Sequence, residues 1–110
     1  MQKIPRAELK VMKFIWDKDD IVTSKEVIEA MKLEYSWKAT TTLTFLSKLT
    51  IKRFLASERI KRITHYTILI TKEEYKAFET KRFLEEIHSN SIESLIVSLE
   101  DCYKNKRTTN

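Results

Sequence analysis

Hydrophobic positions recur at helical spacing in the first third of the chain. Apolar residues three and four positions apart predict a first helix that starts in the turn of Pro5 and ends near Asp17. Thr23 and Glu26 have the spacing of a capping box, in which Thr23 is the N-cap, so a second helix is predicted to begin at Ser24. The residues expected on the buried faces are Leu9, Met12, Ile15, Trp16, Val27, Ile28 and Met31.

A third helix is expected over residues 37–52, with Ser36 as its N-cap. Its inward stripe is predicted to consist of Leu43, Leu46 and Leu49, widened by Phe45. Trp37 is expected to pack against the second helix as part of the core. The outward side holds hydroxyl and ammonium groups and no carboxylate, so it suits an anionic partner that is rich in hydrogen-bond acceptors. DNA fits that description.

The periodicity changes after the third helix. The stretch 63–70 is rich in β-branched and aromatic residues, and together with residues 54–60 it predicts two antiparallel strands joined near Ile60-Lys61. Tight hairpin turns usually contain glycine, and the chain has none, so we expect a longer or looser loop. Three helices followed by such a hairpin form a winged helix-turn-helix, here assigned to residues 1–71.

Two amphipathic helices are expected in residues 72–110, the first opened by Thr71 and the second capped by Ser91. They have little of their own to pack against, so a second copy of the chain is the expected cover; folding back onto the first domain is the alternative. The tail from Lys104 to Asn110 is polar and is expected to fray. The residues predicted to form the dimer contact are Phe83, Ile87, Ile92, Leu95, Ile96 and Leu99.

The net charge of +5 is unevenly distributed. Residues 1–71 carry 14 Lys and Arg against 8 Asp and Glu, whereas residues 72–110 carry 7 against 8. The run from Lys48 to Arg62 contains six bases and one acid, Glu58, which is the pattern of a surface that neutralises phosphates. The alternative is a solvated basic face without a partner. The residues predicted to contact DNA are Ser24, Lys38, Thr40, Thr41, Thr44, Lys48, Arg59, Lys61 and Arg62.

Other classes of protein are disfavoured by the sequence. No recurring carboxylate or thiol lies near His65 or His88 in the sequence, so neither histidine is expected to be catalytic. The chain also has no glycine for a phosphate-binding loop. An enzyme is therefore not expected. Cys102 is the single cysteine and cannot form an internal disulfide or an all-cysteine metal site. We expect no cofactor or metal. No signal peptide or membrane-spanning segment is apparent, which favours a cytoplasmic protein.

Four stretches, in order, resemble the penicillinase repressor family. The segment from Ala7 to Trp16 is similar to the family's opening helix, and Leu95-Ile96 lies where the family has a Leu-Val pair. The other two stretches are Trp37-x-x-Thr40-Thr41-x-x-Thr44-x-Leu46-x-Lys48-Leu49, similar to the recognition helix, and Tyr66-x-x-Leu69-Ile70-x-x-Glu73-Glu74-Tyr75, similar to the exit from the wing.

The resemblance implies a homodimeric transcriptional repressor that binds palindromic operators upstream of β-lactam resistance genes or, in one branch, copper genes. In the antibiotic branch a membrane sensor detects the drug, and the repressor is then cleaved in its C-terminal domain. The pair Ser98-Leu99 stands where that branch usually has Asn-Phe, and the lone Cys102 cannot supply the cysteine cluster of the copper branch. A basic residue of the family's recognition helix is replaced by Leu43, so contact with thymine methyl groups is expected to matter more.

Two rival hypotheses remain at this stage. A winged helix can serve only as a protein-interaction module, and a repressor of the same fold can respond to a different signal. Interaction modules commonly lose the basic character of the third helix and the wing, whereas the bases of this chain are concentrated there. DNA binding that depends strongly on salt would distinguish a repressor from an interaction module.

Overall fold

The chain folds into two compact units, Met1–Tyr75 and the residues from Lys76 onward. The computed structural model describes the backbone of residues 1–108 and the side chains of residues 1–104. Residues 109 and 110 of the predicted polar tail lie outside the described part.

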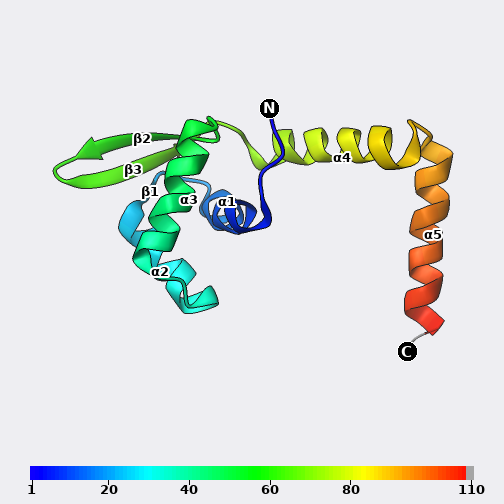
Figure 1. Ribbon diagram of the computed structural model, residues 1–110, viewed down its shortest axis with the longest axis horizontal. Helices are drawn as coiled ribbons and strands as arrows, with labels where there is room; N and C mark the ends of the chain where they lie inside the picture. Colours follow the sequence, from blue (N-terminus) through cyan, green and yellow to red (C-terminus); the bar gives the residue numbers. More distant parts are fainter. Residues whose placement is uncertain (109–110) are drawn as a thin grey trace. The chain divides into compact units, whose positions relative to one another are not determined.

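The first unit contains three helices and a small sheet (Figure 1). The helices are α1 (Arg6–Lys18), α2 (Ser24–Tyr35) and α3 (Ala39–Ile51). The strands are β1 (Val22–Thr23), β2 (Leu55–Ile60) and β3 (Ile63–Ile68), antiparallel in the order β1-β3-β2. The hairpin of β2 and β3 projects away from the end of α3 as the wing (Figure 1). The predicted winged helix-turn-helix is confirmed, with β1 as an additional edge strand paired to Tyr66 and His65 of β3.

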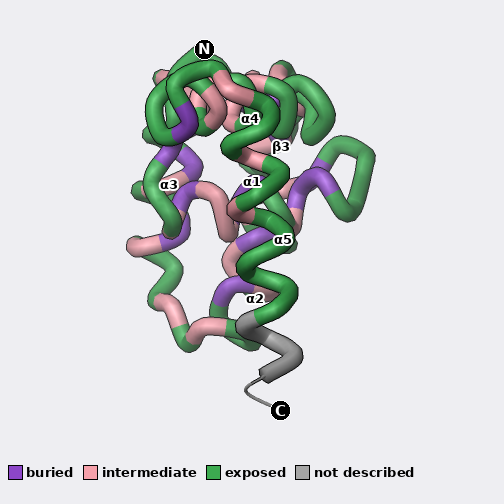
Figure 2. The backbone as a smooth tube through the Cα atoms, turned by 90° about the vertical axis from the view of Figure 1, so that its right-hand side faces the viewer, coloured by how far each residue is buried: buried purple, intermediate pink, exposed green. Residues whose placement is uncertain are grey.

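The core of the first unit lies between the three helices and the base of the sheet, where Figure 2 shows most of the buried backbone. Tyr75, in the first turn of α4 (Lys72–His88), belongs to this core. Its hydroxyl accepts a hydrogen bond from the backbone N–H of Ile4 at 3.0 Å, and its ring centroid lies 5.5 Å from that of Phe54. The buried hydrophobic residues are Ile4, Val11, Met12, Ile15, Trp16, Val22, Val27, Met31, Leu46, Leu49, Phe54, Leu55, Tyr66 and Tyr75.

The start of α2 agrees with the prediction, whereas its end does not. The Thr23–Glu26 capping box is present, with the Glu26 N–H donating to Thr23 Oγ1 at 3.2 Å and the Thr23 N–H donating to Glu26 Oε1 at 3.0 Å. The prediction that Ser36 caps α3 is wrong. Ser36 has φ 59° and ends α2, because its N–H bonds to the Lys32 carbonyl. Consequently α3 begins at Ala39, two residues later than expected.

The inward stripe of α3 also differs from the prediction in one position. Leu46 and Leu49 are fully buried, as expected, but Leu43 is 42% exposed and Thr42 is buried in its place. The later start of α3 does not cause this difference, because the helical phase is fixed by Leu46 and Leu49. Position 42 is four residues before Leu46 and seven before Leu49, which places it in the middle of the stripe.

The turn of the wing contains two residues, although a looser loop was predicted. Ile60 pairs with Ile63, and Lys61 and Arg62 between them have φ values of 50° and 71°. Two consecutive residues with positive φ match the twist of a two-residue hairpin, which glycine or asparagine usually provides. Here the backbone of two basic residues adopts that conformation, although the left-handed region costs a non-glycine residue about 1–2 kcal/mol of conformational free energy.

The second unit consists of the remainder of α4 and α5 (Ile92–Thr108). Ser89 and Asn90, with φ values of 49° and 64°, turn the chain between them. Ser91 caps α5 as predicted, accepting from the Ser94 N–H at 3.0 Å. The prediction of a frayed tail from Lys104 is wrong as far as Thr108, because α5 continues to that residue. Within the described residues, no helix is long and apolar enough to cross a membrane.

Candidate nucleic-acid interface

The outward side of α3 carries the predicted DNA-binding residues. Thr40, Thr44 and Lys48 are exposed, and Thr41 is half-buried. Lys38 is exposed at the N-cap position, where its side chain makes no capping hydrogen bond. The Thr44 hydroxyl donates to the Thr40 carbonyl at 2.9 Å. Its single proton is therefore used within the helix, and only its lone pairs and its methyl group are available to a partner.

Lys52 differs from the other bases of the basic run. Its Nζ lies 2.7 Å from Oε1 of Glu8, a residue of α1 whose side chain is 2% exposed. This contact joins the first and third helices and neutralises one of the six bases counted from the sequence. Lys52 therefore positions α3, while Lys48 remains free to face solvent.

The wing presents the second group of bases. Arg59, Lys61 and Arg62 are all exposed, and the two-residue turn places the last two at the tip of the hairpin. Ile60 and Ile63 flank them and are 44% and 47% exposed. The sheet therefore holds the basic residues of the tip on a short, regular support that leaves their side chains accessible.

A row of aromatic rings supports the turn between α2 and α3. Trp37 lies between Tyr35 and Phe45, with ring centroids 5.2 and 5.1 Å away. Lys10 Nζ lies 4.5 Å from the centroid of Tyr35, within the range of a cation–π contact. Trp37 thus packs on the end of α2, as predicted, and also on α3, but it is half-buried and does not belong to the core.

Lys32 is a further candidate for a DNA contact that the sequence did not indicate. It lines a pocket of about 500 Å³ together with Trp37 and Lys38, at the start of α3. The left-handed conformation of Ser36 turns the chain so that the last turn of α2 contributes to this pocket. Serine gives a weak indication of a left-handed helix end, so the sequence did not reveal this arrangement. Ser24, the remaining predicted contact, is half-buried in the first turn of α2.

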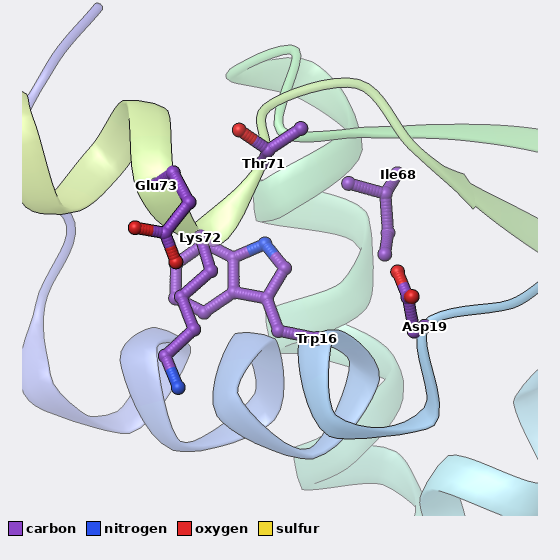
Figure 3. Close-up of a pocket in the computed structure, with 6 residues that line it drawn as sticks. All are labelled: Trp16, Asp19, Ile68, Thr71, Lys72 and Glu73. Atoms are coloured by element: carbon purple, nitrogen blue, oxygen red, sulfur yellow. The ribbon is translucent and has the colours of Figure 1, made fainter.

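A second pocket, of about 370 Å³, lies where β3 leads into α4 (Figure 3). Figure 3 shows the indole of Trp16 beneath the segment that carries Thr71, with Lys72 and Glu73 on one side and Asp19 and Ile68 on the other. The indole N–H donates to the Ile70 carbonyl at 3.0 Å. The pocket mixes charges of both signs around one structural tryptophan, and its residues do not include the predicted DNA contacts.

The described part of the chain contains two histidines, His65 and His88, and one cysteine, Cys102. No group of three or more His, Cys, Asp or Glu side chains is placed to hold a metal ion in that part of the chain. His88 is buried, and its Nδ1 lies 2.9 Å from the Ser94 hydroxyl, where it stabilises the corner between α4 and α5. Burial raises the pKa of the Tyr66 phenol, which makes its ionised form less accessible.

A three-helix unit with an exposed hydroxyl- and lysine-bearing third helix, closed by a basic hairpin, defines a winged helix-turn-helix protein of the DNA-binding type. The model of the penicillinase repressor family matches residues 4–106. The chain belongs to this family.

Relatives and solved structures agree with this assignment. The penicillinase repressor of Bacillus licheniformis is 31% identical over 101 residues, which cover 89% of this chain and 78% of the relative. The methicillin resistance regulatory protein MecI of Staphylococcus aureus is 25% identical over 96 residues, covering 87% and 77%.

The similar solved structures cover about two thirds of this chain. The DNA-binding domain of the repressor BlaI has a TM-score of 0.59 and 36% identity, covering 68% of this chain and 94% of that domain. The monomeric form of Bacillus licheniformis BlaI, solved with the blaP half-operator, has a TM-score of 0.57 and 32% identity, covering 67% and 89%.

Proposed function

We propose that this protein is a homodimeric DNA-binding repressor that controls β-lactam resistance genes through palindromic operators and has no enzymatic activity. One observation carries the proposal. The exposed side of α3 offers hydroxyls and lysines with no carboxylate between Tyr35 and Lys52, and the basic tip of the wing follows it in the same unit. The relatives named for penicillinase repression and methicillin resistance support the choice of target genes.

In this proposal α3 enters the major groove and the wing contacts the adjacent backbone. Lys38 and Lys48 lie at the two sides of the exposed threonines and would each neutralise a phosphate. Arg59, Lys61 and Arg62 would do the same from the wing. The complex of a similar repressor with its half-operator supports this use of the fold.

The second unit supplies the proposed dimer contact. Its two helices leave several large apolar side chains in water, and Figure 2 shows α5 exposed along most of its described length. Paired copies would cover these side chains and hold two α3 helices at the spacing of two half-sites. The proposed contact residues are Phe83 at 48% exposure, Ile87 at 64%, Ile92 at 64%, Ile96 at 49%, Leu99 at 54%, and the half-buried Leu95.

Release from DNA is proposed to follow cleavage at Ser98-Leu99, downstream of a membrane sensor of β-lactams. Both residues lie inside α5, where the backbone is continuously helical. A protease needs access to the peptide bond, so local opening of α5 must precede cleavage. The proposed cleavage site would thus lie within the helix that the proposed dimer uses.

The test is a binding titration of the full chain against duplex DNA recovered from a random-sequence pool. A palindromic consensus and an affinity that falls steeply with salt are expected, with about one unit of log–log slope per neutralised phosphate. Lys48→Glu should weaken binding by at least ten-fold without unfolding the protein. The matched control is Lys81→Glu, the same charge reversal at an exposed lysine of the second unit, which should retain most of the affinity.

A chain that recovers no common sequence and binds no duplex at low salt would contradict the proposal. That result would favour the winged helix as a protein-interaction module. Recovery of a palindrome that lies upstream of genes unrelated to β-lactams would retain the repressor and reject its proposed targets.

A further inference from the structure

The first two turns of α3 form an unusual surface for base recognition. In helix-turn-helix proteins, base edges are contacted mainly by residues in the N-terminal part of the recognition helix. Residues 39–46 have the sequence ATTTLTFL and contain no Arg, Lys, Asn or Gln. The side chains that make paired hydrogen bonds to guanine or adenine are therefore absent from this part of the helix.

Beside the threonine hydroxyls, this part of the helix exposes one large apolar side chain, that of Leu43. Leu43 is 42% exposed, since it lies outside the stripe of α3 that faces the core. Thr44, next to it, is exposed, and its only hydroxyl proton is already donated to the Thr40 carbonyl at 2.9 Å. Thr44 therefore cannot donate to a base or a phosphate in this conformation, and its methyl group is the part without a hydrogen-bonding requirement.

Among base edges in the major groove, the 5-methyl group of thymine is the apolar feature. We propose that Leu43 and the methyl group of Thr44 form an apolar contact that selects thymine in each operator half-site. This inference rests on the proposed DNA-binding function and adds the chemical group that the helix recognises. Burying one methyl group in such a contact should change affinity about three- to five-fold.

The experiment replaces thymine with uracil, one position at a time, in the duplex that the full chain selects from random-sequence DNA. Uracil lacks only the 5-methyl group, so hydrogen bonding and duplex geometry are largely retained. We expect one or two thymines per half-site at which the replacement weakens binding about three- to five-fold. If every uracil-substituted duplex bound with the same affinity as the thymine duplex, or if the selected half-site contained no thymine, the inference would be overturned while the repressor function stands.

Two variants identify the side chain responsible. Leu43→Ala should weaken binding to the thymine duplex and reduce the difference between thymine and uracil, because only the Thr44 methyl group then remains in the contact. Ile51→Ala is the matched control, because Ile51 is also an aliphatic residue of α3 and is 78% exposed, but it lies at the C-terminal end of the helix. A thymine preference that is undiminished in Leu43→Ala, or that disappears in Ile51→Ala, would contradict the assignment to Leu43. The uracil series on the unmodified chain needs no variant. Failure of the unmodified chain to select or bind any thymine-containing duplex would instead reject the proposed function.

Discussion

Glu8 of α1 and Lys52, the residue that ends α3, form an ion pair with 2.7 Å between Oε1 and Nζ. The carboxylate is almost completely buried, whereas the lysine side chain is 22% exposed. An isolated buried carboxylate is strongly unfavourable, so Lys52 is needed to neutralise Glu8. The pair fixes the end of α3 against α1, next to the point where the chain enters the wing.

Lys52→Met should therefore destabilise the protein by about 3 kcal/mol, because it leaves a buried charge unpaired. The double variant Glu8→Leu, Lys52→Met should recover most of this loss, since it removes both charges. Urea unfolding of the wild type, both single variants and the double variant gives the coupling between the two residues. A double variant as unstable as Lys52→Met would argue against the ion pair as the cause.

Thr42→Val should stabilise the protein by about 1 kcal/mol. The Thr42 hydroxyl is buried without a hydrogen-bond partner, and valine replaces it with a methyl group of similar size. Thermal or urea unfolding measures the change. Thr50→Val is a suitable comparison on the same helix, because the Thr50 hydroxyl donates to the Leu46 carbonyl at 2.8 Å and its loss should give no such gain. Destabilisation by Thr42→Val would show that the hydroxyl has a structural role.

The sequence predicted the features whose causes are local. The capping box of α2 follows from the spacing of Thr23 and Glu26, and the buried Leu46 and Leu49 follow from helical periodicity. It failed where a residue adopts a conformation that its type rarely favours. Ser36, Lys61 and Arg62 all have positive φ without being glycine, a conformation that is uncommon for these residue types. The Glu8–Lys52 pair was also missed, because 44 residues separate its members and periodicity carries no information about such contacts.

The turn of the wing offers a test in which stability and DNA binding change in opposite directions. Lys61→Asn, Arg62→Gly should stabilise the protein by about 1–2 kcal/mol, because Asn-Gly is favoured in a two-residue turn with positive φ. The same change removes two basic side chains from the tip and should therefore lower the DNA affinity. It should also reduce the slope of log affinity against log salt concentration by about two units. Unfolding curves and salt-dependent titrations measure the two effects. A variant with higher stability and unchanged salt slope would exclude the tip from the DNA contact.

The start of α4 predicts a pH dependence of stability. The Thr71 backbone N–H donates to Glu74 Oε1 at 2.9 Å and, together with the Thr71 hydroxyl, holds the pKa of Glu74 below its ordinary value of 4.5. Because the folded pKa is depressed, the stabilisation is present above the unfolded pKa and is lost as pH falls through the folded pKa. Glu74→Gln should therefore reduce the free energy of unfolding at pH 6 and have a smaller effect in acid. A titration of the Glu74 carboxyl by NMR that shows a pKa at or above 4.5 would contradict this account.

The proposed dimer is tested by placing a charge at Leu95 of α5. Leu95→Asp should convert the protein into monomers, because the carboxylate would be buried without a partner in the contact between copies. Val97→Asp is the matched control: Val97 is 51% exposed on the same helix, but a spacing of two residues places it on a different side from Leu95. Sedimentation velocity of the wild type and both variants measures the assembly state, and DNA titration should show that only Leu95→Asp loses affinity for the full palindrome. A wild type that is monomeric at all concentrations, or a Val97→Asp variant that dissociates as readily as Leu95→Asp, would reject this side of α5 as the dimer contact.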